Sequence, residues 1–332
     1  GGDRAPENAT AGAILHYWLG PDVEGEVEIE VVDPSGLVIR EFEGEIEGDG
    51  GDGGDGSEGD GDSDEGDSEE APEDEEEDED SSEAEGPEGP EEDEDPEDPN
   101  LEEEELEVAP GMNRFVWDLR YPGPDVIDGS RFSLAYTGGM YAPPGRYTLR
   151  VEAGDQEFEV PVTVGPDPRK PDVTAADLRA QFELTRQVRD RLTEVHAAIR
   201  EIRSIREQTE AYARLAEETD RPESVVEALE EQAESLDETL KEMEESLIQT
   251  KSESGQDPIN FPPKLDDQLA YLYSHVTTSY GRPTGGAQER FRDLVQETQP
   301  VLDRLDGVVA NEVQAFNRAQ DEAGIGACLL YT

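Results

Sequence analysis

The sequence predicts an α+β protein in which an antiparallel β-sandwich, interrupted by an acidic insertion, is followed by an antiparallel helical bundle. Up to about residue 165 apolar residues alternate with polar ones, as in half-buried strands. Beyond that point they recur every three or four residues, as in helices. We therefore divide the 332 residues into a sandwich over 1–165, with the insertion at about 46–108, and a helical bundle over 166–325.

Six segments rich in β-branched and aromatic residues are predicted strands. They are residues 13–19, 27–32, 37–42, 114–119, 146–152 and 157–164. Asp33, Pro34 and Gly36 occupy positions favoured in a type I turn, which predicts a hairpin between the second and third strands. Gly154 and Asp155 predict a tight turn between the last two. Strands joined by hairpins, with no helix between them, indicate a small β-sandwich.

The insertion is extremely acidic. From Asp49 to Glu107 the chain has 34 Asp and Glu residues and no Lys or Arg. Such a segment cannot bury enough apolar surface to offset the entropy cost of ordering, so we predict that it is disordered. Neither flank has enough strands to close a core alone. We therefore expect the insertion to lie within one sandwich.

Two segments of the insertion match binding-site motifs but lack the neighbouring residues or elements that those motifs require. Gly48–Gly53 fits G-x-G-x-x-G, but no helix follows and the surrounding carboxylates would repel a phosphate. Asp60–Asp64 begins like an EF-hand loop, but Glu65 and Ala71 stand where that loop needs Gly and Glu. Weak, multivalent cation binding by the insertion remains the alternative to a solvated spacer.

The whole chain is acidic, with 87 acidic and 26 basic residues and a net charge of −61. Outside the Asp49–Glu107 run, the other 273 residues still carry −27. Nucleic acid and anionic membranes are excluded as partners, because binding either requires clustered Lys and Arg. No stretch approaches the roughly 20 apolar residues of a membrane span.

Only four basic residues are Lys. An excess of carboxylates with scarce Lys is typical of salt-adapted proteins, whose self-repulsion is screened by salt.

Four helical patterns follow the strands and predict a bundle of three or four helices. Thr174 is placed to cap the first helix with Asp177, Pro222 opens the second, and the third begins near Lys264. Pro300 interrupts the fourth and is expected to kink or split it. Their apolar positions, typical of bundle seams, are Val188, Leu192, Val195, Ile199 and Ile202; Leu229, Ala233, Leu236, Leu240, Met243 and Leu247; Leu265, Leu269, Leu272 and Val276; and Phe291, Leu294, Val301, Leu305, Val308 and Phe316. The three prolines of "VGPDPRKPDVT" make a stiff connection, so we expect the sandwich and the bundle to touch.

The sequence contains no recognisable catalytic or metal-binding motif. His16, His196 and His275 lack a second ligand four residues on, and we interpret them as ordinary surface or boundary histidines. No nucleophile elbow is present, and with 87 acids no carboxylate pair can be singled out for sugar hydrolysis. The single cysteine, Cys328, rules out an internal disulfide framework. Because a polar helical pattern stops abruptly before it, we expect Cys328–Thr332 to be a non-native tail. We expect no cofactor.

A family resemblance is carried by the order of five motifs: "GMNRFVWDLRYPGP", "APPGRYTLRV", "VGPDPR", "LRAQFELTRQVRDR" and "DPINFPPKLDDQLAYLYSHVTTSYGRPT". In this order they resemble the C-terminal region of prokaryotic BNR-repeat, sortilin-type β-propeller proteins, often labelled glycosyl hydrolases. The resemblance implies an exported protein with a large N-terminal propeller, an Ig-like sandwich of the hook-capping type and a helical end. The propeller and its S-x-D-x-G-x-T-W repeat are missing from this sequence, so no catalytic residue is carried over.

One loop suggests recognition. In "SRFSLAYTGGMYAPPG", Phe132, Tyr136, Met140 and Tyr141 lie among Gly and Pro with no strand period to bury them. They are candidate contacts for a carbohydrate or peptide ligand. The alternative is that they cover the sandwich core or dock on the propeller or the helices.

We therefore expect a non-catalytic accessory region of a propeller protein from a salt-adapted prokaryote, whose main partner is that N-terminal propeller. The alternative is a glycoside hydrolase-like enzyme that uses carboxylates of the sandwich loops. A pocket with two close carboxylates would favour the enzyme. A broad apolar face left exposed on the sandwich would favour the accessory region.

Overall fold

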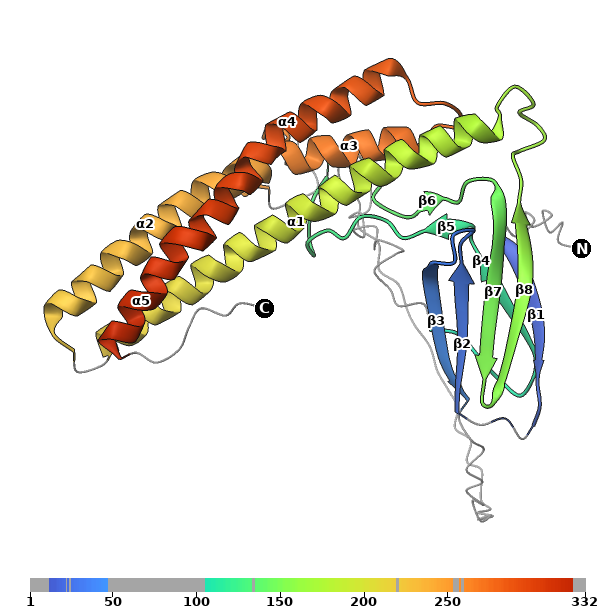
Figure 1. Ribbon diagram of the computed structural model, residues 1–332, viewed down its shortest axis with the longest axis horizontal. Coiled ribbons are helices and arrows are strands. Elements are labelled where there is room, and N and C mark those ends of the chain that lie inside the picture. The colour runs from blue at the N-terminus through green and yellow to red at the C-terminus, as the bar shows by residue number, and fades with distance from the viewer. Residues whose placement is uncertain are drawn as a thin grey trace, which may run out of the picture.

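The computed structural model describes residues 12–21, 23, 25–46, 105–132, 135–218, 221–252, 257 and 260–324. Antiparallel sheets form the N-terminal part and four main helices the C-terminal part, as the sequence predicts (Figure 1). Residues 47–104 of the predicted insertion, both motif matches within it and the tail Cys328–Thr332 lie outside the described residues. The ends of the predicted insertion are described and ordered, because Ile46 belongs to β3 and Leu106 and Val108 pack against the sheet.

The β region contains the six predicted strands and two short additional ones. The strands are β1 (Ala13–Leu19), β2 (Gly25–Val32), β3 (Val38–Ile46), β4 (Gly111–Trp117), β5 (Arg120–Tyr121), β6 (Met140–Tyr141), β7 (Gly145–Ala153) and β8 (Gln156–Val164). One sheet has the order β3-β2-β7-β8, and two smaller sheets pair β1 with β4 and β5 with β6. All pairs are antiparallel.

Most inward residues of these sheets form one core, and a smaller cluster of Leu19, Val27, Ile46 and Ala153 lies apart from it. Phe42 of β3 lies edge-on to Phe115 of β4, with ring centroids 4.8 Å apart. Trp117 of β4 packs on Tyr147 of β7 at 5.0 Å. The cluster draws on β2 and β3, before the insertion, and on β4 and β7, after it. Strands from both sides of the insertion therefore share one core, and β1 and β4 pair across it.

The chain leaves and re-enters the β region beside β3. The backbone N–H of Leu106 donates to the carbonyl of Glu43 at 2.9 Å. A Cβ at Gly44 would lie 2.0 Å from the Leu106 carbonyl oxygen, so only glycine permits this close approach. The insertion is thus an excursion from one edge of the sheet.

Both predicted hairpin turns are confirmed. The Gly36 N–H donates to the Asp33 carbonyl at 3.0 Å, and the Asp33 carboxylate accepts from the N–H groups of Ser35 and Leu37 at 2.7 and 3.1 Å. The β7–β8 turn has Gly154 at φ +57°, a left-handed conformation that glycine adopts without strain.

The helical region is organised around one long helix. Its elements are α1 (Ala175–Glu218), α2 (Glu223–Leu247), α3 (Leu265–Thr278), α4 (Gly285–Val308), the π-helical turn η2 (Val309–Val313) and α5 (Gln314–Ala323). Thr174 and Asp177 form the predicted reciprocal cap, because each side chain accepts from the other's backbone N–H, at 3.2 and 3.1 Å. The predicted seams of α1 and α2 are buried throughout. In Figure 1, α3 lies along the half of α1 nearest the sheets, and α2 along the far half.

Of the two outcomes expected at Pro300, a kink or a split, the split does not occur. Helix α4 continues through Pro300. Proline has no N–H, so the carbonyl of Gln296 lacks its usual helical partner. Both residues are exposed, so water can bind that oxygen. The helix changes instead at Val309–Val313, where one turn is π-helical.

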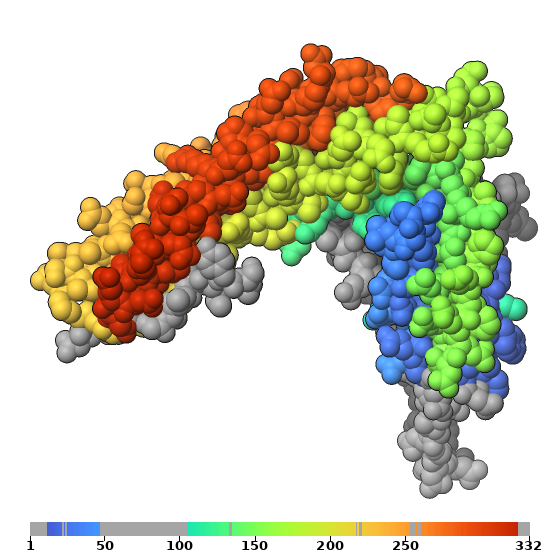
Figure 2. Space-filling model, in the orientation of Figure 1, coloured from blue at the N-terminus to red at the C-terminus, as the bar shows by residue number. Residues whose placement is uncertain are grey.

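The β region and the helices touch, as the stiff connection predicted. Phe182 of α1 packs on Tyr121 of β5, with ring centroids 4.7 Å apart, and joins the sheet core. Figure 2 shows the helices projecting from one end of the sheets, so that the molecule is bent at this junction.

Candidate functional site

A long loop between β5 and β6 ties the sheets to the helices. We call its described residues, 122–132 and 135–139, the strap. β5 and β6 form its base, with Arg120 opposite Tyr141 and Tyr121 opposite Met140. The strap is the longest connection within the described β region, and it is where the sequence placed the contact loop.

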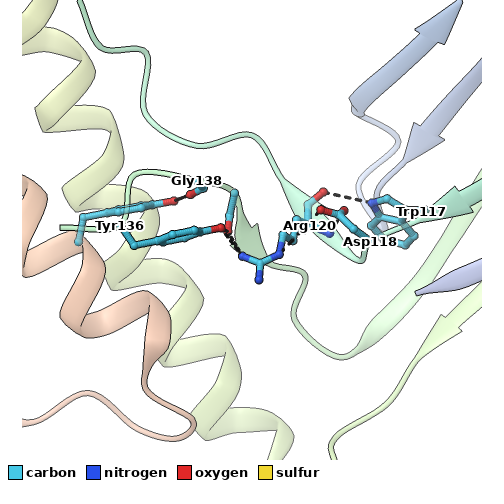
Figure 3. Close-up of polar contacts among 7 residues, drawn as sticks. Trp117, Asp118, Arg120, Tyr136 and Gly138 are labelled. Atoms are coloured by element: carbon cyan, nitrogen blue, oxygen red, sulfur yellow. Dashed lines mark hydrogen bonds and ion pairs between the residues drawn. The ribbon is translucent and has the colours of Figure 1, made fainter. Parts of the chain in front are cut away.

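Arg120 holds the base of the strap (Figure 3). Its guanidinium donates to the Tyr136 hydroxyl and to the Gly139 carbonyl. Its backbone carbonyl accepts from Trp117 Nε1 at 3.1 Å, which connects the network to the β core. From α3, the Tyr273 hydroxyl donates to the Gly138 carbonyl at 2.6 Å. The network thus joins sheet, strap and helix.

Helix α1 holds the other limb of the strap through backbone groups. The Asp125 N–H donates to Thr193 Oγ1 at 3.0 Å, and the Ile127 N–H donates to His196 Nδ1 at 3.2 Å. Arg200 pairs with the Asp125 carboxylate. The α1 side chains thus accept hydrogen bonds from strap N–H groups that have no partner in a strand.

The expectation of a surface or boundary histidine is wrong for His196, which is fully buried. Burial lowers its pKa from 6.5 to about 4, so the ring is neutral near pH 7. The seam positions Val195 and Ile199 lie near it in the sequence, and the strap contacts its ring through the Ile127 N–H and the Phe132 side chain. His16 and His275 are exposed, as expected.

The structure separates the four predicted contact residues. Phe132 and Tyr136 pack against the helical core, and the Phe132 ring lies 5.8 Å from that of His196. Met140 is buried in the sheet core. Tyr141 is 57% exposed, with the Arg120 guanidinium 3.9 Å from its ring centroid. Only Tyr141 is largely open to solvent.

Tyr141 borders a cleft of about 540 Å³ at the junction of sheet and helices. Its lining includes Leu119, Phe182, Tyr280 and the prolines on either side of the junction. Largely apolar clefts of this size between structural units are typical ligand sites. Leu119 has a φ of +63°. Residues other than glycine adopt this left-handed backbone conformation only at a cost in free energy. The sequence pointed to Tyr141 but missed Phe182 and Tyr280, because nothing local shows that α1 and the α3–α4 turn meet β6.

The described residues that line the cleft do not include a pair of carboxylates. Among its described lining residues, Asp167 is the single acid. Arg169 Nε and Nη2 bind both oxygens of that carboxylate at 2.9–3.2 Å. Hydrogen bonds from the Arg169 side chain and backbone lower the pKa of Asp167, which keeps it ionised and occupied.

The outer face of the β1–β4 pair carries three exposed apolar side chains, with the exposed pair His16 and Arg114 between them. Trp18 and Met112 lie directly opposite each other, each 68% exposed, and Ile14 is 46% exposed two positions along the same side. Alternation along β1 sends Leu15 and Tyr17 towards the core and leaves these side chains in solvent. We call Ile14, Trp18 and Met112 the apolar face.

The outer face of the four-stranded sheet carries carboxylates instead. Glu28 lies among Glu30, Glu41 and Glu152, and burial together with their charges raises its pKa to about 7. Arg150, on the same face, pairs with Glu30. Within the described residues no group of three or more His, Cys, Asp or Glu side chains could hold a metal ion.

Comparison of the chain with protein-family models, with curated proteins and with solved structures gave no match. Among the described helices, none is both long and apolar enough to cross a membrane.

Proposed function

We propose that this chain is a non-catalytic accessory region, an Ig-like sandwich followed by a helical bundle, of an exported and salt-adapted BNR-repeat, sortilin-type propeller protein. Its role in this proposal is to pack against the N-terminal propeller and to hold it in a fixed relation to the helices. The order of sequence motifs supports the family, and the strap network supports a stiff connection between the two regions.

The observation that carries the proposal is the apolar face. A cross-strand pair of a tryptophan and a methionine, each 68% exposed, is unusual on a chain with a net charge of −61. Exposed apolar patches of this kind mark interaction surfaces. β1 is the first strand among the described residues, and in this proposal the preceding propeller covers its outer face.

The enzyme alternative has less support. The described residues lining the junction cleft include a single carboxylate, which is bound by Arg169, whereas sugar hydrolysis uses two carboxyl groups about 5 to 10 Å apart. We propose instead that the cleft, with Tyr141 and Tyr280 at its sides, accepts a carbohydrate or peptide segment without reaction.

The test is association with the separately produced propeller, measured by titration calorimetry at high salt. We expect the double substitution Trp18→Ser and Met112→Ser to weaken association at least about tenfold, because central aromatic anchors dominate interfaces. The melting temperature should change little, since both side chains are exposed. Leu37→Ser removes an equally exposed apolar side chain at the β2–β3 turn and should bind normally. Equal affinity for all three proteins would exclude the apolar face.

A further inference from the structure

The apolar face has a basic pair at its centre. The outer side of β1 and β4 consists of three cross-strand pairs, which are Ile14 with Val116, His16 with Arg114, and Trp18 with Met112. His16 and Arg114 are both exposed. Two side chains that can donate hydrogen bonds to an anion therefore lie between two apolar pairs.

The two outer faces of the β region differ in charge. Neither β1 nor β4 contains an Asp or Glu residue, in a chain with 87 acidic and 26 basic residues. The outer face of the four-stranded sheet instead has three cross-strand pairs of glutamates, which are Glu26 with Glu45, Glu28 with Glu43, and Glu30 with Glu41. An anionic group that approaches β1 and β4 meets no carboxylate of either strand, whereas those glutamates repel an anion from the other face.

The basic pair adds nothing to the stability of the sheet. Like charges directly opposite each other on neighbouring strands are destabilising, and histidine gains charge as the pH falls towards 6. The exposed apolar side chains on either side gain nothing from contact with water either. Both features become favourable together when a carboxylate lies over the basic pair and apolar groups cover its flanks.

From this pattern we propose that the surface which docks on the apolar face presents an Asp or Glu carboxylate to Arg114 and His16, and apolar side chains to Trp18 and Met112. The inference rests on the proposed docking of this face and names the chemistry of its partner. Charge complementarity carries it, because a carboxylate makes strong, charge-assisted hydrogen bonds with a guanidinium. Apolar contacts around that pair exclude water and strengthen it.

The first test extends the calorimetry with the separately produced propeller. Arg114→Gln should weaken association at least about fivefold, because a charge-assisted hydrogen bond to the partner is lost. This deficit should shrink when the salt concentration is raised about tenfold, since salt screens partly exposed charges. Arg114→Lys keeps the charge and should recover part of the affinity. Arg146→Gln, which removes an exposed arginine of β7 on the other outer face, is the matched control and should bind as the wild type does.

The outcomes separate this inference from the proposed function. If the double substitution Trp18→Ser and Met112→Ser weakens association but Arg114→Gln does not, the face docks without a partner carboxylate and the inference is wrong. If the propeller binds neither the wild type nor the variants, the proposed function fails, and a small probe decides the inference.

That probe is phenylacetate, which joins an apolar ring to a carboxylate, and phenylacetamide is its uncharged analogue. The full chain with isotope-labelled tryptophan gives two indole signals in NMR spectra, because Trp18 and Trp117 are its only tryptophans. We expect phenylacetate to shift the Trp18 signal saturably and to bind at least about threefold more tightly than phenylacetamide. The signal of Trp117, which is buried, should not move. Arg114→Gln should abolish the difference between the two probes. Equal binding of both probes to the wild type, or no shift of the Trp18 signal, would overturn the proposal.

Discussion

The helical and β regions carry their carboxylates in different ways. In the helices, acids meet arginines by spacing and by packing: Glu244 lies between Arg203 and Arg206, and Glu210 pairs with Arg214 one turn on. On the four-stranded sheet, acids of neighbouring strands lie side by side, so that Glu28 is crowded by other carboxylates. An acidic composition therefore stabilises one region through pairing and strains the other through repulsion.

The largest expected effect that separates the two regions is on pH stability. The pKa of His196 is about 4 when folded and 6.5 when unfolded. As the pH falls from 6.5 to 4, only the unfolded chain takes up this proton, so the helical region should lose on the order of 3 kcal/mol of stability. Glu28 has the opposite sign. Its folded pKa of about 7 lies above the ordinary 4.5, so its contribution is greatest below pH 4.5 and is lost as the pH rises through 7.

Spectroscopy can separate these trends, because both tryptophans, Trp18 and Trp117, lie in the β region. Tryptophan fluorescence reports the sheets and circular dichroism at 222 nm the helices. His196→Gln should reduce the loss of helical stability at acid pH that circular dichroism reports. His275→Gln, at an exposed position, should leave that loss unchanged. If both signals were lost together at acid pH, in both variants, the acid sensitivity of the helices could not be assigned to His196.

The second effect concerns the paired acid of the helices. Glu244→Gln leaves Arg203 and Arg206 without a buried counter-charge and should lower the stability of the helical region by about 2 kcal/mol. Molar salt should reduce the loss only in part, because Glu244 is buried while the Arg203 and Arg206 side chains are 45% and 27% exposed. Glu242→Gln, which removes an exposed partner of Arg304, is the control and should cost less than about 0.5 kcal/mol. Similar losses for the two substitutions would mean that burial of Glu244 adds nothing.

The third effect concerns the repulsion between neighbouring carboxylates on the four-stranded sheet. Lowering the salt from molar to millimolar should reduce the melting temperature, and more in the fluorescence signal than in circular dichroism, because repulsion is concentrated on the sheet. Glu28→Gln should recover about 1 kcal/mol at low salt and less at high salt. A melting temperature independent of salt would remove the argument for salt adaptation.

The features that the sequence predicted correctly are local. The Asp33–Gly36 turn and the Thr174–Asp177 cap depend on residues within four positions of each other. The possible split at Pro300 was wrong, because an exposed proline can stay inside a helix whose freed carbonyl faces water. His196 was misjudged because its burial depends on a strap about 70 residues earlier.

The candidate site shows the same limit. The loop with Phe132 and Tyr141 was found from composition, but which side chains face solvent depends on how the strap docks.

The smallest expected effect concerns the insertion that separates β3 from β4. The chain leaves β3 at Ile46 and returns beside it at Leu106, so the core already brings the two ends of the insertion together. Deleting Gly48 to Asn100 and closing the gap with a short turn should therefore preserve both spectra. Loop-closure entropy depends only logarithmically on length, so stability should rise by about 1 kcal/mol.

The deletion also removes 29 carboxylates, which should weaken the salt dependence of the melting temperature without abolishing it, because the sheet face remains. The alternative is that the insertion binds calcium and holds the two halves of the β region together. In that case calcium would raise the melting temperature of the intact chain, and the deletion would unfold the sheets while leaving the helical signal. Fluorescence and circular dichroism at matched ionic strength distinguish the two, because only calcium-dependent ordering predicts loss of the tryptophan signal alone.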